Sequence, residues 1–596
     1  MAKQNFISPM PGIVHSIECS VGDSCESGSE ILILEAMKME TAICAPAQIM
    51  IDEIAVIQGQ VINKGDVLFS YSKQNNRESS GSDIAVIDHN KKENKFLDEL
   101  RVREKWLIDK TRPAAVEKRK SKGYNTAREN LHKLVDDNSF SEYGGLIVAA
   151  QLSRRSMRDL IENTPADGLI AGTCRINSEY YSQNTDCVIM IYDYSVLAGT
   201  QGTMNHIKMD RVLEIAHRNE TPVILFAEGG GGRPGDVDQQ TIAGLHIPTF
   251  TEFARLNGKV PVVSIVNGYC FAGNAALAGC SDIIIATKSI SLGMGGPAMI
   301  EGGGLGKVHP KEVGPYETHI QNGVVDILVE DENEAIAVCK RYLGYFQGKS
   351  KHYNHNDQSS LRDIIPENRK RVYDMRALIN HLADIDSTLE LREHYGKGII
   401  TCFIRIEGQT FGVIANNPSF EAGAITAENA IKANEFLTLC NTHKLPVISL
   451  VDTPGIMVGV ESEKTGNVKH ASRLFVTGAK LDVPLFGIVV RRAYGLGAMA
   501  MVGGSMRVPD ILLAWPTGEF GAMGLEGAVK LGFRKELEAV ENDEDREKLY
   551  QKMVAEAYDR GKALSMATMF EIDDVIDPKH TRERIIKAFR TSKKEP

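Results

Sequence analysis

The sequence lacks the features of a membrane, secreted or nucleic-acid-binding protein. Its longest apolar runs, such as residues 222–227, are far shorter than the roughly 20 residues of a membrane-spanning helix. The first residues show no basic start followed by an apolar stretch, as a secretory signal would. A net charge of −10 disfavours binding to phosphate backbones, which needs surplus basic residues. These absences predict a cytoplasmic protein without a nucleic-acid partner.

The cysteines also exclude two classes of protein. Ten are present, and no two have the CxxC spacing of redox or zinc motifs. In a reducing compartment they are expected to be free, mostly core residues, so we predict no metal site. Hydrophobic residues make up 43% and charged residues 24%, which is typical of globular proteins. At roughly 150 residues per domain, 596 residues predict three or four domains.

The first 72 residues contain a short internal repeat. Short apolar segments alternate with glycine-containing turns, which predicts an all-β module. A shift of 37 positions superposes Ile17, Gly22 and Gly28 on Ile54, Gly59 and Gly65. We therefore predict a flattened barrel of two similar β-halves over residues 1–72, with residues 35–40 forming the hairpin turn between them.

A second, longer repeat organises the rest of the chain. Residues 73–93 are rich in polar residues and predict a flexible linker. Beyond them strands alternate with amphipathic helices, as in α/β proteins. Adding 224 maps Gly199, Lys208, Pro222, Gly231 and Gly235 onto Gly423, Lys432, Pro446, Gly455 and Gly459 without a gap. We predict two α/β halves, residues 94–348 and 387–596, joined by a crossover over 349–386.

Lys38 stands between two methionines in the predicted turn of the β-module. A lysine in a turn is usually only a solvated charge, so its neighbours decide the interpretation. The sequence EAMKME at residues 35–40 resembles the attachment site of biotin carboxyl carrier domains. Lipoyl domains have the same architecture, but their lysine is not usually flanked by methionine on both sides. The resemblance implies an N6-biotinyllysine at Lys38, attached by a biotin protein ligase.

The region from about residue 95 to 590 contains a set of specific motifs. They are TARE at 126–129, NGYCFAG at 267–273, ANNP at 415–418, DTPG at 452–455, AYGLG at 493–497 and WP at 515–516. Together they resemble the carboxyltransferase component of biotin-dependent acyl-CoA carboxylases. The resemblance implies tandem crotonase-like (ClpP/crotonase) halves, the first for acyl-CoA and the second for biotin. GLGA at 495–498 and WPTGEF at 515–520 are most similar to long-chain acyl-CoA carboxylases that join all components in one polypeptide.

Glycine-rich turns are the expected catalytic elements of this family. Carboxylation beside a thioester passes through an enolate, whose charge is well met by backbone N–H groups at a strand-to-helix turn. The resemblance places the acyl-CoA carbonyl on the N–H groups of Ala272 and Gly273, and the biotin ureido oxygen on those of Leu496 and Gly497. No side-chain base is needed in the family mechanism. The alternative for each turn is a tight loop.

One further glycine-rich segment has two interpretations. Residues 228–235 (EGGGGRPG) either form a nest around an anion or permit a close turn of the backbone. The family's more usual members have SGGAR near residues 230–233, so acyl chain length stays open.

The resemblance implies transfer of CO2 from carboxybiotin to the α carbon of acetyl-, propionyl- or a longer acyl-CoA. The chain has no room for a biotin carboxylase, so we expect that enzyme as a separate subunit, and a homodimer or hexamer. One alternative is the carboxyltransferase of a glutaconyl-CoA type decarboxylase sodium pump. Another, of a different class, is an inactive biotin-bearing binding protein. Reaction direction and partner identity stay open.

Overall fold

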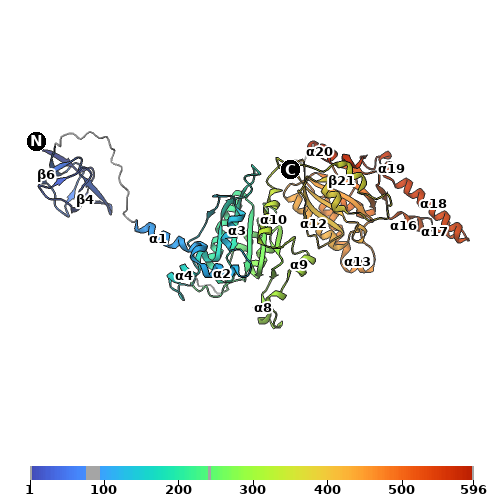
Figure 1. Cartoon of the computed structure of the whole chain (residues 1–596), viewed down its shortest axis with the longest axis horizontal. Helices are drawn as coiled ribbons and strands as arrows, with labels where there is room; N and C mark the ends of the chain where they lie inside the picture. Colours follow the sequence, from blue (N-terminus) through green and yellow to red (C-terminus); the bar gives the residue numbers. More distant parts are fainter. Residues whose placement is uncertain (1–2, 75–93, 239–242, 593–596) are drawn as a thin grey trace. The chain divides into compact units, whose positions relative to one another are not determined.

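The structure is a computed structural model that describes residues 3–74, 94–238 and 243–592. The chain divides into two compact units, Met1–Asn94 and Lys95–Pro596 (Figure 1). Nearly all of the predicted linker at 73–93 lies outside the described residues. Its first residue, Lys73, still belongs to a strand of the first unit.

The first unit consists of two four-stranded sheets related by the 37-residue repeat. One sheet has the order β1-β8-β6-β3 and the other β5-β4-β2-β7. Shifting β1, β2, β3 and β4 by 37 residues gives β5, β6, β7 and β8, so the repeat converts one sheet into the other. The strands are β1 Gln4–Ile7, β2 Gly12–Ile17, β3 Ser24–Cys25, β4 Glu30–Ala36, β5 Met39–Cys44, β6 Ile49–Ile54, β7 Val61–Ile62 and β8 Val67–Lys73.

The second unit contains two eight-stranded sheets of the same strand order. The first is β9-β10-β11-β12-β13-β14-β16, with β15 also on β13. The second is β17-β18-β19-β20-β21-β22-β24, with β23 also on β21. The strands are β9 Ser141–Glu142, β10 Leu169–Arg175, β11 Asp186–Tyr192, β12 Val223–Gly229, β13 Val262–Phe271, β14 Ile283–Thr287, β15 Ser291–Gly293, β16 Ile327–Val329, β17 Leu389–Leu391, β18 Ile399–Ile406, β19 Gln409–Asn416, β20 Val447–Thr453, β21 Leu485–Tyr494, β22 Ile511–Ala514, β23 Glu519–Gly521 and β24 Asp574–Val575.

Helices accompany both sheets, and the central strands are buried along their whole length, as expected for parallel strands covered on two faces. The helices of the first half are α1 Lys95–Glu104, α2 Pro113–Lys120, α3 Ala127–Leu134, α4 Met157–Asn163, α5 Thr203–Asn219, α6 Thr249–Ala254, α7 Gly273–Gly279, α8 Pro297–Gly302, α9 Tyr316–Gln321 and α10 Glu332–Gly344. Those that follow are α11 Met375–Leu382, α12 Ala427–Thr442, α13 Val460–Lys464, α14 Asn467–Gly478, α15 Gly495–Met501, α16 Leu525–Gly532, α17 Arg534–Glu538, α18 Asp543–Gly561, α19 Ala563–Thr568 and α20 Thr581–Thr591. No helix in the described part of the chain is long and apolar enough to span a membrane.

The two halves share one hydrophobic core. A single cluster contains Tyr342 of α10 together with Phe403 of β18 and Phe436 of α12. The ring centroids of Tyr342 and Phe403 lie 5.9 Å apart, in an edge-on contact. The last helix of the first half therefore packs directly on the second sheet.

Strand register shows how far the 224-residue repeat extends. The pairing of Val188 with Val223 recurs as Gly412 with Val447, which is a shift of 224 for both partners. In the next strand the shift falls to 223, because Val262 pairs with Val223 as Leu485 pairs with Val447. The same shift relates Phe271 to Tyr494 at the ends of these strands. The residue after Phe271 therefore corresponds to the residue after Tyr494.

Candidate active site

Lys38 occupies the tip of a tight hairpin in the first unit. Strands β4 and β5 end at the pair Ala36 and Met39, which leaves Met37 and Lys38 as a two-residue turn. Their φ angles of 52° and 64° are those of a type I′ turn, whose twist matches the flanking strands. Met37 is 98% exposed and Met39 is 71% exposed. An exposed lysine on such a tip fits a covalently attached biotin, because a ligase can reach it.

Two equivalent strand-to-helix turns carry the predicted backbone donors. The first joins β13 to α7 at Ala272, and the second joins β21 to α15 at Gly495. Both residues have positive φ, 53° and 55°. The strand register makes Ala272 the counterpart of Gly495, and Gly273 the counterpart of Leu496. The predicted pairs, Ala272 with Gly273 and Leu496 with Gly497, are therefore offset by one residue between the halves.

The hydrogen bonds of the first turn separate the two donors predicted there. The Ala272 N–H donates to the carbonyl of Gly293 at 3.0 Å, so the sheet already uses it. Gly273 is the first residue of α7, where an N–H has no acceptor within the helix. This geometry fits Gly273 as a donor and does not fit Ala272, whose role as a donor we revise.

Small residues at these turns allow close backbone packing. A Cβ on Gly273 would lie 1.9 Å from Oε1 of Gln201, and one on Gly497 would lie 2.6 Å from the Gly455 backbone. The Leu496 side chain is 60% exposed, so it does not fill the turn. Glycine is therefore required at 273 and 497 by packing, as well as by any role in catalysis.

A cavity of about 850 Å³ lies in the first half. Its lining includes Lys118, Lys122 and Lys311, which favour an anionic ligand. Sequence motifs did not single out these lysines, because each is only a charged residue until the fold brings them together. The other lining residues are Ala114, Ala115, Arg119, Tyr124, Tyr194, Ser195, Ala198, Glu228, Gly268, Tyr269 and Ser289.

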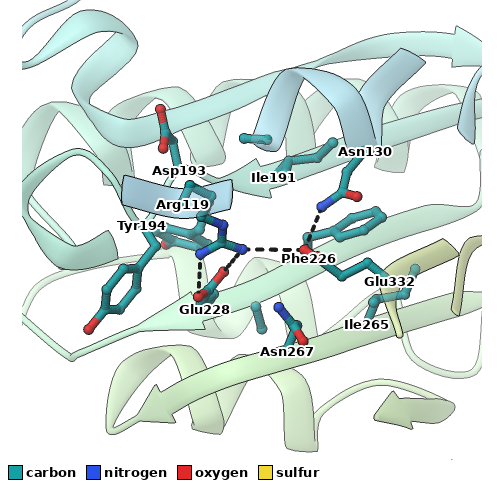
Figure 2. Close-up of a pocket in the computed structure, with 13 residues that line it drawn as sticks. Arg119, Asn130, Ile191, Asp193, Tyr194, Phe226, Glu228, Ile265, Asn267 and Glu332 are labelled. Carbon is teal, nitrogen blue, oxygen red and sulfur yellow. Dashed lines mark hydrogen bonds and ion pairs between the residues drawn. The ribbon is translucent and has the colours of Figure 1, made fainter. Parts of the chain in front are cut away.

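An ion pair between Glu228 and Arg119 lines this cavity and also a separate small cavity of about 10 Å³, which is shown in Figure 2. The two guanidinium nitrogens donate to the carboxylate at 2.6 and 2.7 Å. Burial raises the pKa of the Glu228 carboxyl to about 7, although Arg119 opposes the shift. Glu228 is thus paired within the protein, and two of the glycines after it, Gly229 and Gly231, allow close packing of the backbone. A Cβ on Gly229 would lie 2.2 Å from the carbonyl oxygen of Gly199.

A smaller cavity of about 360 Å³ occupies the equivalent place in the second half. Ala198 lines the first cavity and its counterpart Ala422 lines the second, with φ angles of 53° and 54°. Tyr494, the residue before the second turn, lines the smaller cavity and donates from its hydroxyl to Glu519 at 3.0 Å. The other lining residues are Arg369, Lys370, Val372, Pro418, Pro454, Arg491, Arg492, Gly524, Glu526 and Tyr558. The smaller cavity is therefore lined by β21 up to the residue before the second turn, and the larger cavity is lined by Gly268 and Tyr269 of β13, the strand that leads to the first turn.

Family models match both units of the chain. Residues 118–596 match the carboxyl transferase domain, and residues 4–70 match the biotin-requiring enzyme domain. The methylmalonyl-CoA carboxyltransferase 12S subunit of Propionibacterium freudenreichii subsp. shermanii is 30% identical over 80% of this chain and 90% of its own length. The methylmalonyl-CoA decarboxylase subunit alpha of Veillonella parvula is 28% identical over 80% of this chain and 91% of its own.

Solved structures give the same assignment. A single-chain, multi-domain long-chain acyl-CoA carboxylase superposes with a TM-score of 0.80 and 47% identity over 98% of this chain. This chain spans only 56% of the length of that protein. Transcarboxylase 12S, described as a hexamer, superposes with a TM-score of 0.73 and 28% identity over 84% of this chain and 95% of its own.

The chain belongs to the carboxyl transferase family. It is a biotin-dependent acyl-CoA carboxyltransferase, with a small all-β biotin domain before two crotonase-like halves. The predicted fold class, the biotin cofactor and the likeness to long-chain acyl-CoA carboxylases are confirmed.

Proposed function

We propose that the protein moves a carboxyl group between biotin on Lys38 and the α carbon of an acyl-CoA, as the carboxylating subunit of an acyl-CoA carboxylase. The observation that carries the proposal is the pair of equivalent turns, each at the end of a strand that lines a cavity. Two substrates that must react with each other need two such sites. An inactive binding protein would have no reason to keep both turns.

The larger cavity is the better site for acyl-CoA. Its volume of about 850 Å³ suits a large ligand, and its three lysines suit phosphate groups. The Gly273 N–H would then meet the developing charge on the thioester oxygen. One such donor typically lowers a barrier by about 3 kcal/mol.

The smaller cavity is the better site for the bicyclic ring of biotin. The N–H groups of Leu496 and Gly497 belong to the first turn of α15, so they and the helix dipole favour an oxygen with negative charge. Biotin, when attached, supplies the carboxyl group that is transferred. The side chain of Lys38 serves as its tether and raises its local concentration, to about the mM range for a short flexible link.

The organisation that we propose follows the same division. Residues 1–72 carry biotin, 73–93 form the linker, 94–348 bind acyl-CoA, 349–386 cross over and 387–596 bind biotin. A separate biotin carboxylase loads the cofactor, and a biotin protein ligase attaches it. We also propose a homodimer or hexamer in the cytoplasm, where the hexameric transcarboxylase 12S gives the precedent for assembly.

Decarboxylation is a second candidate direction. It is favoured by the likeness to the methylmalonyl-CoA decarboxylase subunit, because the same turns stabilise the same enolate from either side. Avidin capture of the native protein would separate the two. A soluble ATP-binding partner supports the carboxylase, whereas a membrane protein of several spans supports the decarboxylase.

A lysine substitution tests the proposal as a whole. Lys38→Ala is expected to abolish avidin binding and ATP-coupled turnover, while carboxyl exchange between malonyl-CoA and added free biotin persists. Lys64→Ala is the matched control, because Lys64 is another exposed turn lysine of the first unit. Loss of exchange with free biotin in Lys38→Ala alone would overturn the tether account, and absence of exchange in the wild type would overturn the proposed activity.

A further inference from the structure

Helix α2 forms a wall of the larger cavity without a hydrophobic anchor. It contributes Ala114, Ala115, Lys118 and Arg119 to the lining, and Lys122 follows directly after it. None of its apolar side chains is buried. A helix is normally held in place by an apolar face against the core, so another interaction must hold this one.

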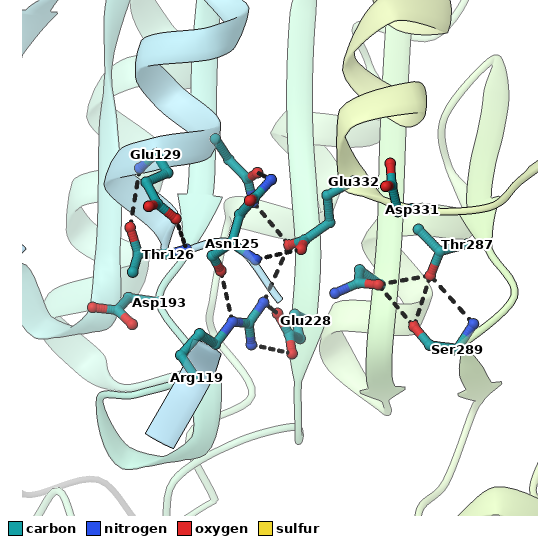
Figure 3. A network of polar contacts seen from close by, with 12 residues as sticks. Arg119, Asn125, Thr126, Glu129, Asp193, Glu228, Thr287, Ser289, Asp331 and Glu332 are labelled. Atoms are coloured by element: carbon teal, nitrogen blue, oxygen red, sulfur yellow. Dashed lines mark hydrogen bonds and ion pairs between the residues drawn. The ribbon is translucent and has the colours of Figure 1, made fainter. Parts of the chain in front are cut away.

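Two arginines supply such interactions. Arg112, which directly precedes the helix, bonds to Asp193 at 2.8 Å, and the second anchor is Arg119. Its side chain is only 10% exposed, and its guanidinium bonds to Glu228 on β12 as well as to Glu332 at the start of α10, at 3.3 Å. Its Nε donates to the carbonyl of Asn125 at 2.8 Å, and its guanidinium lies 4.9 Å from the centre of the Tyr124 ring. One side chain thus fixes α2 and the loop after it to two other elements (Figure 3).

The two carboxylates are placed to hold this arginine. Glu332 also accepts hydrogen bonds from the Asn125 N–H at 2.7 Å and from the Asn130 side chain at 2.9 Å. Glu228 lies directly beneath Gly268, where an added Cβ would come within 2.9 Å of its Oε1. Gly268 lines the cavity and lies this close to the ion pair. A shift of Arg119 must therefore move α2 relative to this part of the lining.

We propose that Arg119 is a positioning residue for the acyl-CoA substrate. It sets where Lys118 and Lys122 stand relative to the reacting turn at Gly273, and Glu228 and Glu332 hold it in that position. The inference rests on the proposed function, which places acyl-CoA in this cavity. It assigns Arg119 an effect on substrate binding and no contact with the reacting atoms.

A second buried arginine in the same half provides a matched control. Arg128 bonds to Glu142 through two nitrogens at 2.6 and 3.0 Å. Its side chain is 16% exposed, and it does not line the cavity. A role in folding alone would make the two arginines equivalent, whereas a role in positioning would separate them.

The test compares Arg119→Lys with Arg128→Lys in the full chain. Lysine keeps the charge but cannot make the forked contact of a guanidinium with two carboxylates. With free biotin as the acceptor, Arg119→Lys is expected to raise the KM for malonyl-CoA by about tenfold, with kcat and the KM for biotin within about threefold of the wild type. Arg128→Lys should change none of the three.

Calorimetric titration with coenzyme A, which carries no acyl group, separates failure of this inference from failure of the proposed function. The affinity for coenzyme A should fall in Arg119→Lys in step with the rise in KM. Unchanged affinity and KM, or equal changes in both variants, would overturn the positioning role and leave the proposed function in place. No binding of coenzyme A to the wild type would overturn both. If Arg119→Lys does not fold, Glu332→Gln, which keeps the shape of the side chain, should raise the KM in the same direction.

Discussion

Two buried lysines in equivalent places predict different effects on stability. Lys208 on α5 and Lys432 on α12 are related by the 224-residue repeat. Nζ of Lys208 donates to the carbonyl oxygens of Gly144, at 3.2 Å, and Leu169. Nζ of Lys432 has no hydrogen-bond partner among the described residues and its side chain lines a cavity of about 40 Å³. Replacement of Lys432 by methionine therefore removes a charge that the protein compensates only in part, through the charge of Glu390.

The magnitude follows from the lysine's titration. Burial lowers the pKa of Lys432 from its ordinary 10.5 to about 8. That difference corresponds to a cost of about 3 kcal/mol for the charged form at pH 7. Methionine has a similar shape and no charge, so Lys432→Met should raise the free energy of unfolding by about 1 to 3 kcal/mol.

The lowered pKa of Lys432 also predicts how the stability difference between the wild type and Lys432→Met depends on pH. Below pH 8 the folded protein holds the charged lysine at full cost. Between pH 8 and 10.5 the unfolded chain binds more protons than the folded one, so the stability of the wild type rises with pH. The advantage of Lys432→Met is therefore largest at neutral pH and shrinks as the pH approaches 10.5.

Urea unfolding followed by tryptophan fluorescence would measure this difference. Trp515 is a suitable probe, because it is buried in the core of the second half and donates to Thr581 at 2.9 Å. Lys208→Met is the control. Burial lowers the pKa of Lys208 to about 8 as well, but this variant should gain less stability than Lys432→Met, because it leaves the two carbonyl oxygens without their charged donor. A destabilised Lys432→Met, or a difference that does not change between pH 7 and pH 10, would refute the reasoning.

The two turns give further predictions. Gly497→Ala places a Cβ 2.6 Å from the Gly455 backbone and should slow transfer from free biotin by at least about tenfold. Gly532→Ala is the control and should not slow transfer, because a Cβ there would have no atom within 4 Å. Equal rates of the two variants in a steady-state assay would show that the turn tolerates displacement. Ala272→Gly should raise the free energy of unfolding in urea by about 1 kcal/mol, because φ 53° and ψ −121° are strained for alanine, and a loss of stability would contradict this.

Local patterns in the sequence predicted an all-β module and two α/β halves, and the family resemblance of the motifs supplied the crotonase-like fold. The shifts of 37 and 224 residues were visible because each repeat keeps its own turn and strand signals in phase. Lys38 was identified for the same reason, since its six-residue context and its hairpin are both local. The amino-acid sequence by itself therefore determined the fold class and the biotin cofactor.

The arrangement of the site was decided by contacts between distant residues. Arg119 pairs with Glu228 and Glu332, which lie 109 and 213 positions further along the chain. The sequence also did not reveal the one-residue offset between the two turns. Only the strand register shows where the shift between the two halves changes from 224 to 223 residues. Whether a buried polar group finds a partner depends on packing in three dimensions, so sequence repeats that look equivalent, such as Lys208 and Lys432, differ in the folded protein.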